Sequence, residues 1–343
     1  MCRKEKKNTK KPDVPLPPVS VIICARNESD ELLQHLETVL NQDYPVYEVI
    51  VVNYCSEDDT EVVLSALKIR YPHLRSTIIK NDTPFLNSKK FAASIGIKAA
   101  QYEWLLFTDA TCRPASNLWI KSMSRYFTDK KDIVLGHGGY LGGTSLADKW
   151  MNYVSCFNTL RYFGFAMCGM PCTGTSKNLA YRKSIYFANN GFANHAHILS
   201  GDEDLLVSQA ATRKNVAVSL SHNAHTYCSQ EPFSGWMQKL CGHFNASSNY
   251  KRIYRFLLFF EPFSRLPMWA SLVFLMCCSL LWQYILGIYL LRTIIFLIIF
   301  GVAAKRFKAK VAAPYALFFD LAMPFFYAYA YLFNKILMNR KWN

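Results

Sequence analysis

The stretch WLLFTDATCR, residues Trp104–Arg113, decides the fold. Four apolar residues lead through Thr108 to a single carboxylate, Asp109, and a small residue, a hydroxyl residue and then Pro114 follow. This pattern is typical of a buried parallel strand that runs into a polar turn. In open α/β sheets the ligand site lies beyond the carboxyl ends of the strands, so Asp109 stands where a site is expected. The alternative role for Asp109 is to cap a helix that begins near Ser116.

Apolar runs alternate with helical patterns on both sides of this stretch. The alternation predicts an α/β fold with a doubly wound, mostly parallel sheet. The first loop lacks GxGxxG and no GxxxxGK[ST] occurs, which argues against a dinucleotide site of the Rossmann type and against a P-loop. The predicted strands cover residues 19–25, 48–53, 76–80, 104–107 and 133–136.

Polar side chains follow three of these strands, namely Arg26-Asn27-Glu28, Asn53 with Asp58, and Asp109. Because the carboxyl ends of parallel strands meet at one edge, we expect these groups to converge. A cleft with acidic residues and few glycines suits a nucleotide whose base and ribose are held by side chains. Its diphosphate would be held by a metal ion on carboxylates.

The C-terminal part is expected to lie in a membrane. Between Leu266 and Ala304 the only charged side chain is Arg292, and between Val311 and Asn334 it is Asp320. Such long uncharged runs predict transmembrane helices at about residues 266–282 and 284–304. The third apolar segment, 311–333, is either another span or an interfacial segment. We expect Arg292 to face protein or a lipid headgroup, because a charge at mid-depth is costly.

The charge distribution sets the expected orientation and partners. Basic residues flank the 266–304 hairpin on both sides, so both flanks are expected on the cytoplasmic side. The net charge of +15, with a basic, disordered tail at residues 1–17, suits membrane lipids or a phosphate-bearing substrate better than nucleic acid. No apolar stretch lies near the N-terminus, so a secretory signal is not expected. The eleven cysteines show no CxxC pair and are therefore expected to be reduced thiols.

Five motifs follow one another along the chain: ARNE at 25–28, the strand and acidic turn at 51–60, the helix at 89–100, TDAT at 108–111 and GDEDLL at 201–206. A QxxRW-like region follows at 236–243. With these motifs in order, the first 250 or so residues resemble a family-two inverting glycosyltransferase of the A-type nucleotide-sugar fold. The later apolar segments add a similarity to bacterial membrane-anchored glycosyltransferases. Each motif alone is weak, but five in sequence are strong together.

The resemblance implies roles for particular residues. The catalytic base is Glu203 or Asp204, with Asp202 completing the acidic motif; placing Asp202-Glu203 on the family's acidic pair favours Glu203. The implied donor-binding residues are Ala25, Arg26, Asn27, Glu28, Asn53, Asp58, Lys89, Asp109, Ala110, Thr111 and Lys177. The implied acceptor-side or diphosphate-binding residues are Trp236, Gln238, Lys239 and His243.

Three site motifs depart from the family pattern. Thr111 occupies the position of the second carboxylate of the family's DxD motif. A hydroxyl group binds Mg²⁺ or Mn²⁺ more weakly than a carboxylate does. Asp109 is therefore the one metal ligand that the resemblance still implies. Tyr54 stands where the family often has Asp, and Lys239–His243 lacks the expected Gln and Arg. The sequence is therefore consistent with a modified enzyme, or with a degenerate scaffold that binds a partner transferase.

The expected organisation is a catalytic domain at residues 18–250 followed by a membrane domain at 251–343. The expected function is transfer of a sugar from a nucleoside diphosphate sugar to a lipid-linked or polysaccharide acceptor, with inversion. The expected location is the cell (inner) membrane, as a multi-pass protein with a cytoplasmic catalytic domain. Other enzymes of envelope-glycan synthesis are the implied protein partners.

Overall fold

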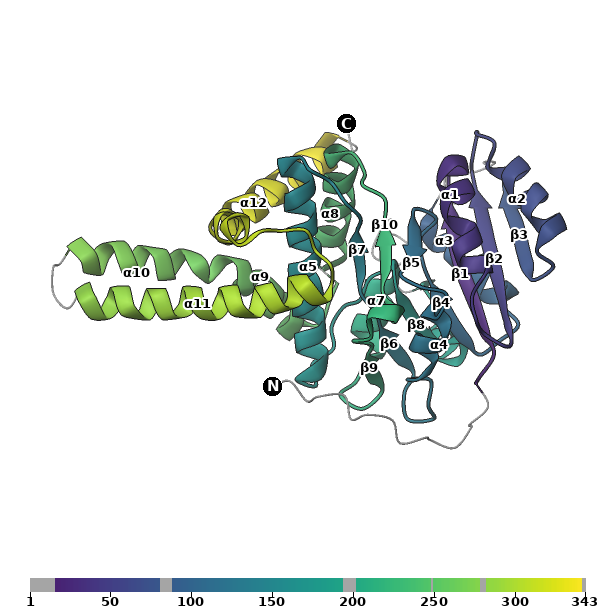
Figure 1. Ribbon diagram of the computed structural model, residues 1–343, viewed down its shortest axis with the longest axis horizontal. Helices are drawn as coiled ribbons and strands as arrows, with labels where there is room; N and C mark the ends of the chain where they lie inside the picture. The colour runs from purple at the N-terminus through teal and green to yellow at the C-terminus, as the bar shows by residue number, and fades with distance from the viewer. Residues whose placement is uncertain (1–15, 81–87, 194–201, 248, 278–281, 341–343) are drawn as a thin grey trace.

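The computed structural model describes residues 16–80, 88–193, 202–247, 249–277 and 282–340, so nearly all of the predicted basic tail lies outside it. Figure 1 shows a sheet-containing body from which two helices project. The strands are β1 (Val19–Ala25), β2 (Tyr47–Tyr54), β3 (Leu74–Ile79), β4 (Trp104–Phe107), β5 (Cys112–Pro114), β6 (Ile133–Leu135), β7 (Gly138–Tyr140), β8 (Leu179–Arg182), β9 (Val216–Val218) and β10 (Thr226–Cys228). The helices are α1 (Ser29–Leu40), α2 (Thr60–Arg70), α3 (Lys89–Ala99), α4 (Trp119–Ser124), α5 (Leu146–Met167), α6 (Lys183–Ala188), α7 (Asp202–Ala210), α8 (Phe233–Ser247), α9 (Arg252–Phe263), α10 (Arg265–Cys277), α11 (Trp282–Arg306) and α12 (Ala313–Arg340).

The main sheet has the strand order β3-β2-β1-β4-β8-β6-β9. Neighbouring strands are parallel except where β8 runs antiparallel to β4 and β6. The predicted mostly parallel sheet is thus confirmed, and the opening stretch forms β4 beside β1. Since β1, β2 and β4 run the same way, their carboxyl ends lie at one edge.

Helices cover both faces of this sheet. Val21 and Ile23 of β1 face the apolar cluster that contains Leu36 of α1, together with residues of α2 and α4. Ile22 faces the opposite cluster, which contains Ile97 of α3 and residues of α5. Because successive side chains of a strand point to opposite faces, one apolar strand serves both layers. This arrangement confirms the doubly wound fold.

A second, three-stranded sheet has the order β5-β10-β7. Cys112 of β5 lies directly opposite Cys228 of β10 in the antiparallel register, and the two form a disulfide. The expectation that all the cysteines are reduced is therefore wrong for this pair. Sequence spacing could not reveal the pairing, because the two residues are 116 positions apart and meet only through the tertiary fold.

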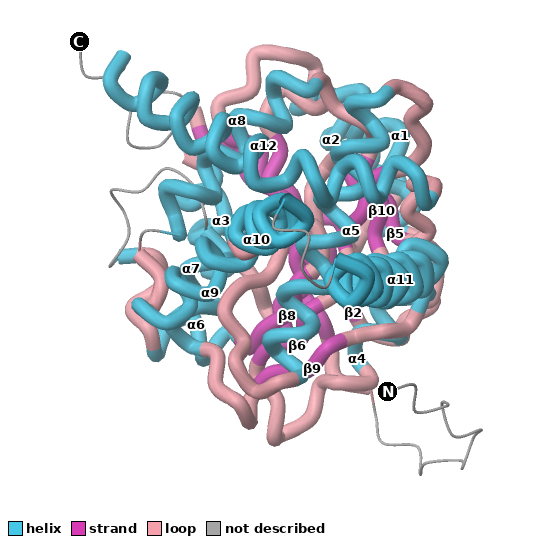
Figure 2. The backbone as a smooth tube through the Cα atoms, turned by 90° about the vertical axis from the view of Figure 1, so that its left-hand side faces the viewer, coloured by secondary structure: helices cyan, strands magenta, loops and turns pink. Residues whose placement is uncertain are grey.

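Two helices are long and apolar enough to cross a membrane, at Gln283–Arg306 in α11 and at Ala313–Asn334 in α12. They agree with the predicted segments 284–304 and 311–333. The predicted segment 266–282 begins with α10, and its residues 278–281 lie outside the described part, so this span stays a prediction. Figure 2, viewed from the projecting end, shows α10 and α11 side by side, whereas α12 lies over α8.

A buried carboxylate joins the three C-terminal helices. Asp320 of α12 accepts one hydrogen bond from Arg265 of α10 and another from Arg292 of α11, each 2.7 Å long. Asp320 is 2% exposed, so both charge-assisted contacts are shielded from solvent. The expectation that Arg292 faces protein is confirmed.

Candidate active site

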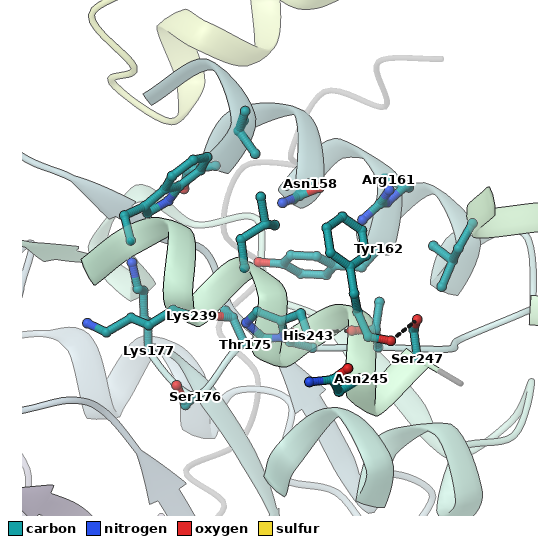
Figure 3. Close-up of a pocket in the computed structure, with 18 of the residues that line it drawn as sticks. Asn158, Arg161, Tyr162, Thr175, Ser176, Lys177, Lys239, His243, Asn245 and Ser247 are labelled. Carbon is teal, nitrogen blue, oxygen red and sulfur yellow. Dashed lines mark hydrogen bonds between the residues drawn. The ribbon is translucent and has the colours of Figure 1, made fainter. Parts of the chain in front are cut away.

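A large cavity of about 1620 Å³ opens beyond the carboxyl ends of β1, β2 and β4. It reaches from these strand ends to the C-terminal helices, and Figure 3 shows its polar lining. Nine of the eighteen sequence-predicted site residues meet here. Those that line the cavity are Arg26, Glu28, Lys89, Asp109, Thr111, Lys177, Trp236, Lys239 and His243.

Asp109 is held by two donors on the cavity floor. Lys89 Nζ lies 2.5 Å from Asp109 Oδ1, and Ser176 Oγ donates to Asp109 Oδ2 at 3.3 Å. The Ser88 side chain caps α3 by accepting from the Phe91 amide, which fixes Lys89 in the first helical turn. Burial alone would raise the pKa of Asp109, but the nearby lysine ammonium groups, Lys89 foremost, lower it to about 2. Asp109 is therefore an ionised carboxylate whose two oxygens are already engaged.

Glu28 has the opposite electrostatic character. Burial, aided by the charge of Asp109, raises the pKa of Glu28 to about 7. Two carboxyl groups of one cavity thus have pKa values several units apart, a difference that recurs in catalytic sites. Tyr54, which stands where the family often has Asp, lines the same cavity, and burial raises the pKa of its hydroxyl group.

Lys177 and Lys239 lie on one side of the cavity (Figure 3). Tyr140 and Glu231 connect them: Lys177 contacts Tyr140, and Lys239 contacts Glu231. The Lys177 ammonium lies 3.6 Å from the centre of the Tyr140 ring, and burial lowers the pKa of this lysine to about 8. The Tyr140 hydroxyl donates to Glu231 at 2.8 Å, and Glu231 pairs with Lys239 at 2.6 Å. At Gly138 an added Cβ would lie 2.4 Å from Lys177 Cβ, so a side chain there would displace the lysine.

Sequence reasoning missed Tyr140 and Glu231. The only local indication of a site was the pair Gly138 and Gly139 before Tyr140. Such glycines are equally typical of a mobile turn. Glu231 precedes Pro232 and the start of α8, so its sequence context resembles an ordinary helix start. Only the alignment of β7 with β10 brings the two residues together.

One face of α8 lines the cavity. Trp236, Lys239, Leu240 and His243 recur at intervals of three and four residues, which places them on the same side of the helix. Gln238 lies between these positions, is exposed and does not line the cavity. The structure thus gathers three of the four predicted acceptor-side residues.

The remaining predicted donor residues lie elsewhere. Asn53 and Asp58 line a separate pocket of about 220 Å³ beside the ends of β2 and β3. The Asp58 carboxylate accepts from the amides of Ser29 and Thr60, at the starts of α1 and α2. These hydrogen bonds lower its pKa, even though burial opposes them. Asp58 therefore stabilises two helix N-termini.

Three more predicted donor residues support the loops from which the cavity is built. Ala25 and Ala110 are buried among core residues. Asn27 adopts a left-handed backbone conformation with φ of 52°, and its side chain accepts from the Glu57 amide at 2.8 Å. These contacts tie the loop after β1 to the loop after β2.

The acidic motif begins α7 at Asp202. The side chains of Asp202, Glu203 and Asp204 lie outside the described part of the structure. Leu205, the next residue, packs in a cluster with Ala246 of α8. The first turn of α7 therefore lies next to the helix that lines the cavity.

The described residues do not fit a resident divalent ion. Mg²⁺ and Mn²⁺ favour several carboxylate or carbonyl oxygens, but Thr111 supplies only a neutral hydroxyl group. An ion at Asp109 would compete with Lys89 for Oδ1 and with Ser176 for Oδ2. Across the residues that the structure describes, no cluster of three or more His, Cys, Asp or Glu side chains could hold a metal.

The far end of the cavity is apolar and lies among the C-terminal helices. Arg161 of α5 stands at the boundary, 3.9 Å from Glu261 of α9. Arg255 of α9 also lines this part. The apolar side chains that line it are Phe256, Leu258, Phe259, Pro262, Phe263, Tyr327, Tyr331 and Leu332.

Residues 20–183 match the family described as Glycosyl transferase family 2. This part of the chain is a glycosyltransferase family 2 domain. Glycosyltransferase AglE of Haloferax volcanii is 25% identical over 235 residues, which are 65% of this chain and 71% of AglE. Succinoglycan biosynthesis protein ExoO of Rhizobium meliloti is 32% identical over 101 residues, which are 29% of this chain and 27% of ExoO.

A solved structure shows the same fold over most of both chains. It is the mannosyltransferase PcManGT from Pyrobaculum calidifontis, in complex with GDP-Man and Mn²⁺, with a TM-score of 0.56 and 16% identity. The alignment covers 89% of this chain and 86% of PcManGT. Together with the family match, it confirms the predicted A-type glycosyltransferase fold and the enzyme class.

Proposed function

We propose that this glycosyltransferase moves a sugar from a nucleoside diphosphate sugar to a lipid-linked acceptor at the cytosolic face of the cell membrane. The observation that carries the proposal is the shape of the cavity. A single space joins Asp109, at the strand ends where a donor is expected, to apolar side chains of α9 and α12. A lipid-linked acceptor is amphipathic in the same way, since its lipid needs apolar walls and its reacting end needs polar ones.

The surface around this end of the cavity supports a membrane location. A cluster of large apolar side chains exposed to solvent is unusual for a soluble domain and is typical of a surface that contacts another apolar phase. α9 is amphipathic, and Arg252 and Arg255 accompany its exposed aromatic residues, as in helices that lie in an interface. The exposed apolar residues of α9 to α11 include Ile253, Phe256, Phe259, Phe260, Val273, Phe274, Ile288, Leu291 and Ile298.

Within this proposal α10 and α11 form the membrane hairpin, and α9 with α12 forms an interfacial layer over the domain. The packing of Phe319, Met323 and Ala330 in the main apolar cluster supports the interfacial role of α12. Both ends of the hairpin then stay on the side of the catalytic domain, and the basic flanks make that side cytosolic.

The proposed reaction is a single displacement. The acceptor hydroxyl oxygen attacks the anomeric carbon while the bond from that carbon to the diphosphate oxygen breaks. The nucleoside diphosphate leaves with the bonding electrons, and a carboxylate takes the hydroxyl proton, so the configuration inverts. We assign that base to Glu203 or Asp204, because the first turn of α7 adjoins α8. Asp109 contacts the donor, and Trp236, Lys239 and His243 shape the acceptor or diphosphate side.

The test uses the purified full-length chain in lipid nanodiscs. Radiolabelled nucleotide sugars are supplied one at a time with a lipid extract of the host, and product is separated by partition into organic solvent. We expect label to enter the organic phase from one donor, and Asp109→Asn to lower the rate about tenfold to 100-fold. Asp43→Asn, on the exposed Asp43–Lys121 pair, is the control that keeps the rate.

The outcomes separate the parts of the proposal. Label in soluble glycan alone would keep the transferase and refute the lipid acceptor. No transfer from any donor to either acceptor class would refute the proposed function. The degenerate scaffold inferred as an alternative from Thr111 and Tyr54 would then be favoured.

A further inference from the structure

The Lys177 ammonium lies in the cavity against an aromatic ring. No hydrogen bond or ion pair joins it to another side chain that the structure describes, and its contact is the π face of Tyr140 at 3.6 Å. Gly138 leaves the room that this position needs. A partly buried ammonium that a ring holds in place, and that no described carboxylate contacts directly, can accept an anionic ligand.

Two further lysines face the same space. Lys89 pairs with Asp109 and also donates to Ser176 Oγ at 3.4 Å, whereas Lys239 pairs with Glu231 and keeps donors beyond that contact because an ammonium group has three. With Arg26, four cationic side chains line the cavity or its immediate wall, against the carboxyl groups of Glu28, Asp109 and Glu231. The charge balance among these described residues is positive, as a diphosphate requires.

The described residues of this site offer few oxygen ligands to a divalent ion. Thr111 removes one carboxylate, and both oxygens of Asp109 already accept from Lys89 and Ser176. An ion would have to displace Lys89 and would then face the positive charges of Lys177 and Lys239. The residues present therefore favour an anion over a cation at this position.

We propose that the ammonium groups of Lys177 and Lys239 bind the donor diphosphate directly, beside the Lys89–Asp109 pair and in place of a divalent ion. This inference rests on the proposed function. When the bond between the anomeric carbon and the diphosphate oxygen breaks, that oxygen keeps the electron pair. The two ammonium groups neutralise the added charge, which is the electrostatic task that a metal ion performs in other transferases.

The test is calorimetric titration of the full chain in nanodiscs with UDP, GDP, CDP, ADP and TDP, in EDTA and again with Mn²⁺. We expect one nucleotide to bind in EDTA, with a dissociation constant that Mn²⁺ changes by less than about threefold. Lys177→Met and Lys239→Met should each weaken binding about tenfold to 100-fold, as expected for the loss of a charge-assisted contact. Lys98→Met, an exposed lysine on the same helix as Lys89, is the matched control.

Each result has a distinct meaning. Binding that appears only with Mn²⁺ would overturn the lysine site and leave the proposed function standing. Binding in EDTA that Lys177→Met and Lys239→Met leave within about threefold of wild type would also overturn it. Failure of every nucleotide to bind in both conditions would refute the proposed function itself.

Discussion

Replacing Asp320 by Asn should destabilise the C-terminal helices far more than the same change at an exposed ion pair. The Asp320 carboxylate is 2% exposed and accepts 2.7 Å hydrogen bonds from Arg265 and Arg292. An amide of the same shape leaves Arg292 without this counter-charge and leaves Arg265 with Glu261, at 2.8 Å, as its remaining carboxylate partner. Removing one partner of a buried ion pair costs about 3–5 kcal/mol, which corresponds to roughly two to four orders of magnitude in the equilibrium constant.

The control is Asp43→Asn, because Asp43 pairs with Lys121 at 3.2 Å on the exposed surface. That change should cost at most about 1 kcal/mol. The assay is unfolding of both variants in mixed micelles of rising SDS content, followed by far-ultraviolet circular dichroism. A triple change of Arg265 and Arg292 to Met and Asp320 to Leu should recover part of the loss, since apolar replacement removes the uncompensated charges. Equal unfolding midpoints for Asp320→Asn and Asp43→Asn would refute the joining of α10, α11 and α12 by this carboxylate.

Three further predictions concern the site. Nucleotide binding should weaken between pH 6 and 8, because Glu28, with its pKa of about 7, changes from neutral to negative beside the anionic ligand, and Lys177, with its pKa of about 8, begins to lose its charge. Glu28→Gln should flatten the Glu28 part of this calorimetric pH profile, and an unchanged profile would contradict the assignment. Thr111→Asp should weaken nucleotide binding in EDTA about tenfold, because it adds a negative charge beside the lysines, and Mn²⁺ should restore it; binding unaffected in EDTA would count against the charge argument. Cys112 and Cys228 should resist alkylation in the denatured, unreduced chain, and reduction should lower the stability by about 2–4 kcal/mol in chemical unfolding; alkylation of both thiols before reduction would disprove the disulfide.

The sequence predicted the long buried strands well for a simple physical reason. β1 and β4 are buried on both faces, so they appear as unbroken apolar runs, and their predicted limits coincide with those in the structure. Their ends also located Asp109 and Glu28 correctly at one edge. Local sequence patterns suffice where burial on both faces leaves no room for polar residues.

The short strands could not be predicted in the same way. β5, β7 and β10 have three residues each, which is too few for a periodic signal, and only long-range contacts define them. The same strands carry Cys112 and Cys228 and position Tyr140. The support of Lys177 was therefore invisible in the sequence, although Lys177 itself was identified as a phosphate-binding candidate.

Asp58 shows that the sequence can identify a motif without showing all that its residues do. Its carboxylate was assigned to the donor, yet in the structure it accepts the amides of Ser29 and Thr60. A carboxylate in a turn between a strand and a helix has two uses, and the spacing of the motif does not distinguish them. The small pocket that Asp58 lines with Asn53 leaves a role toward the nucleobase as a proposal.

The departures from the family pattern are best understood as one change in charge. Considered separately, Thr111 and Lys239 indicate that two motifs of the family have been lost. The alternative of a non-catalytic scaffold was inferred from such losses. In the structure the lost carboxylate and the lysines belong to one cavity, where Lys89 already neutralises Asp109. Removing an acid beside a cation site and supplying cations are compensating changes for a ligand that carries the same negative charge. Random loss of function gives no reason for Lys177 and Lys239 to converge on Tyr140 and its partner Glu231, so this convergence favours a working transferase with a modified diphosphate site.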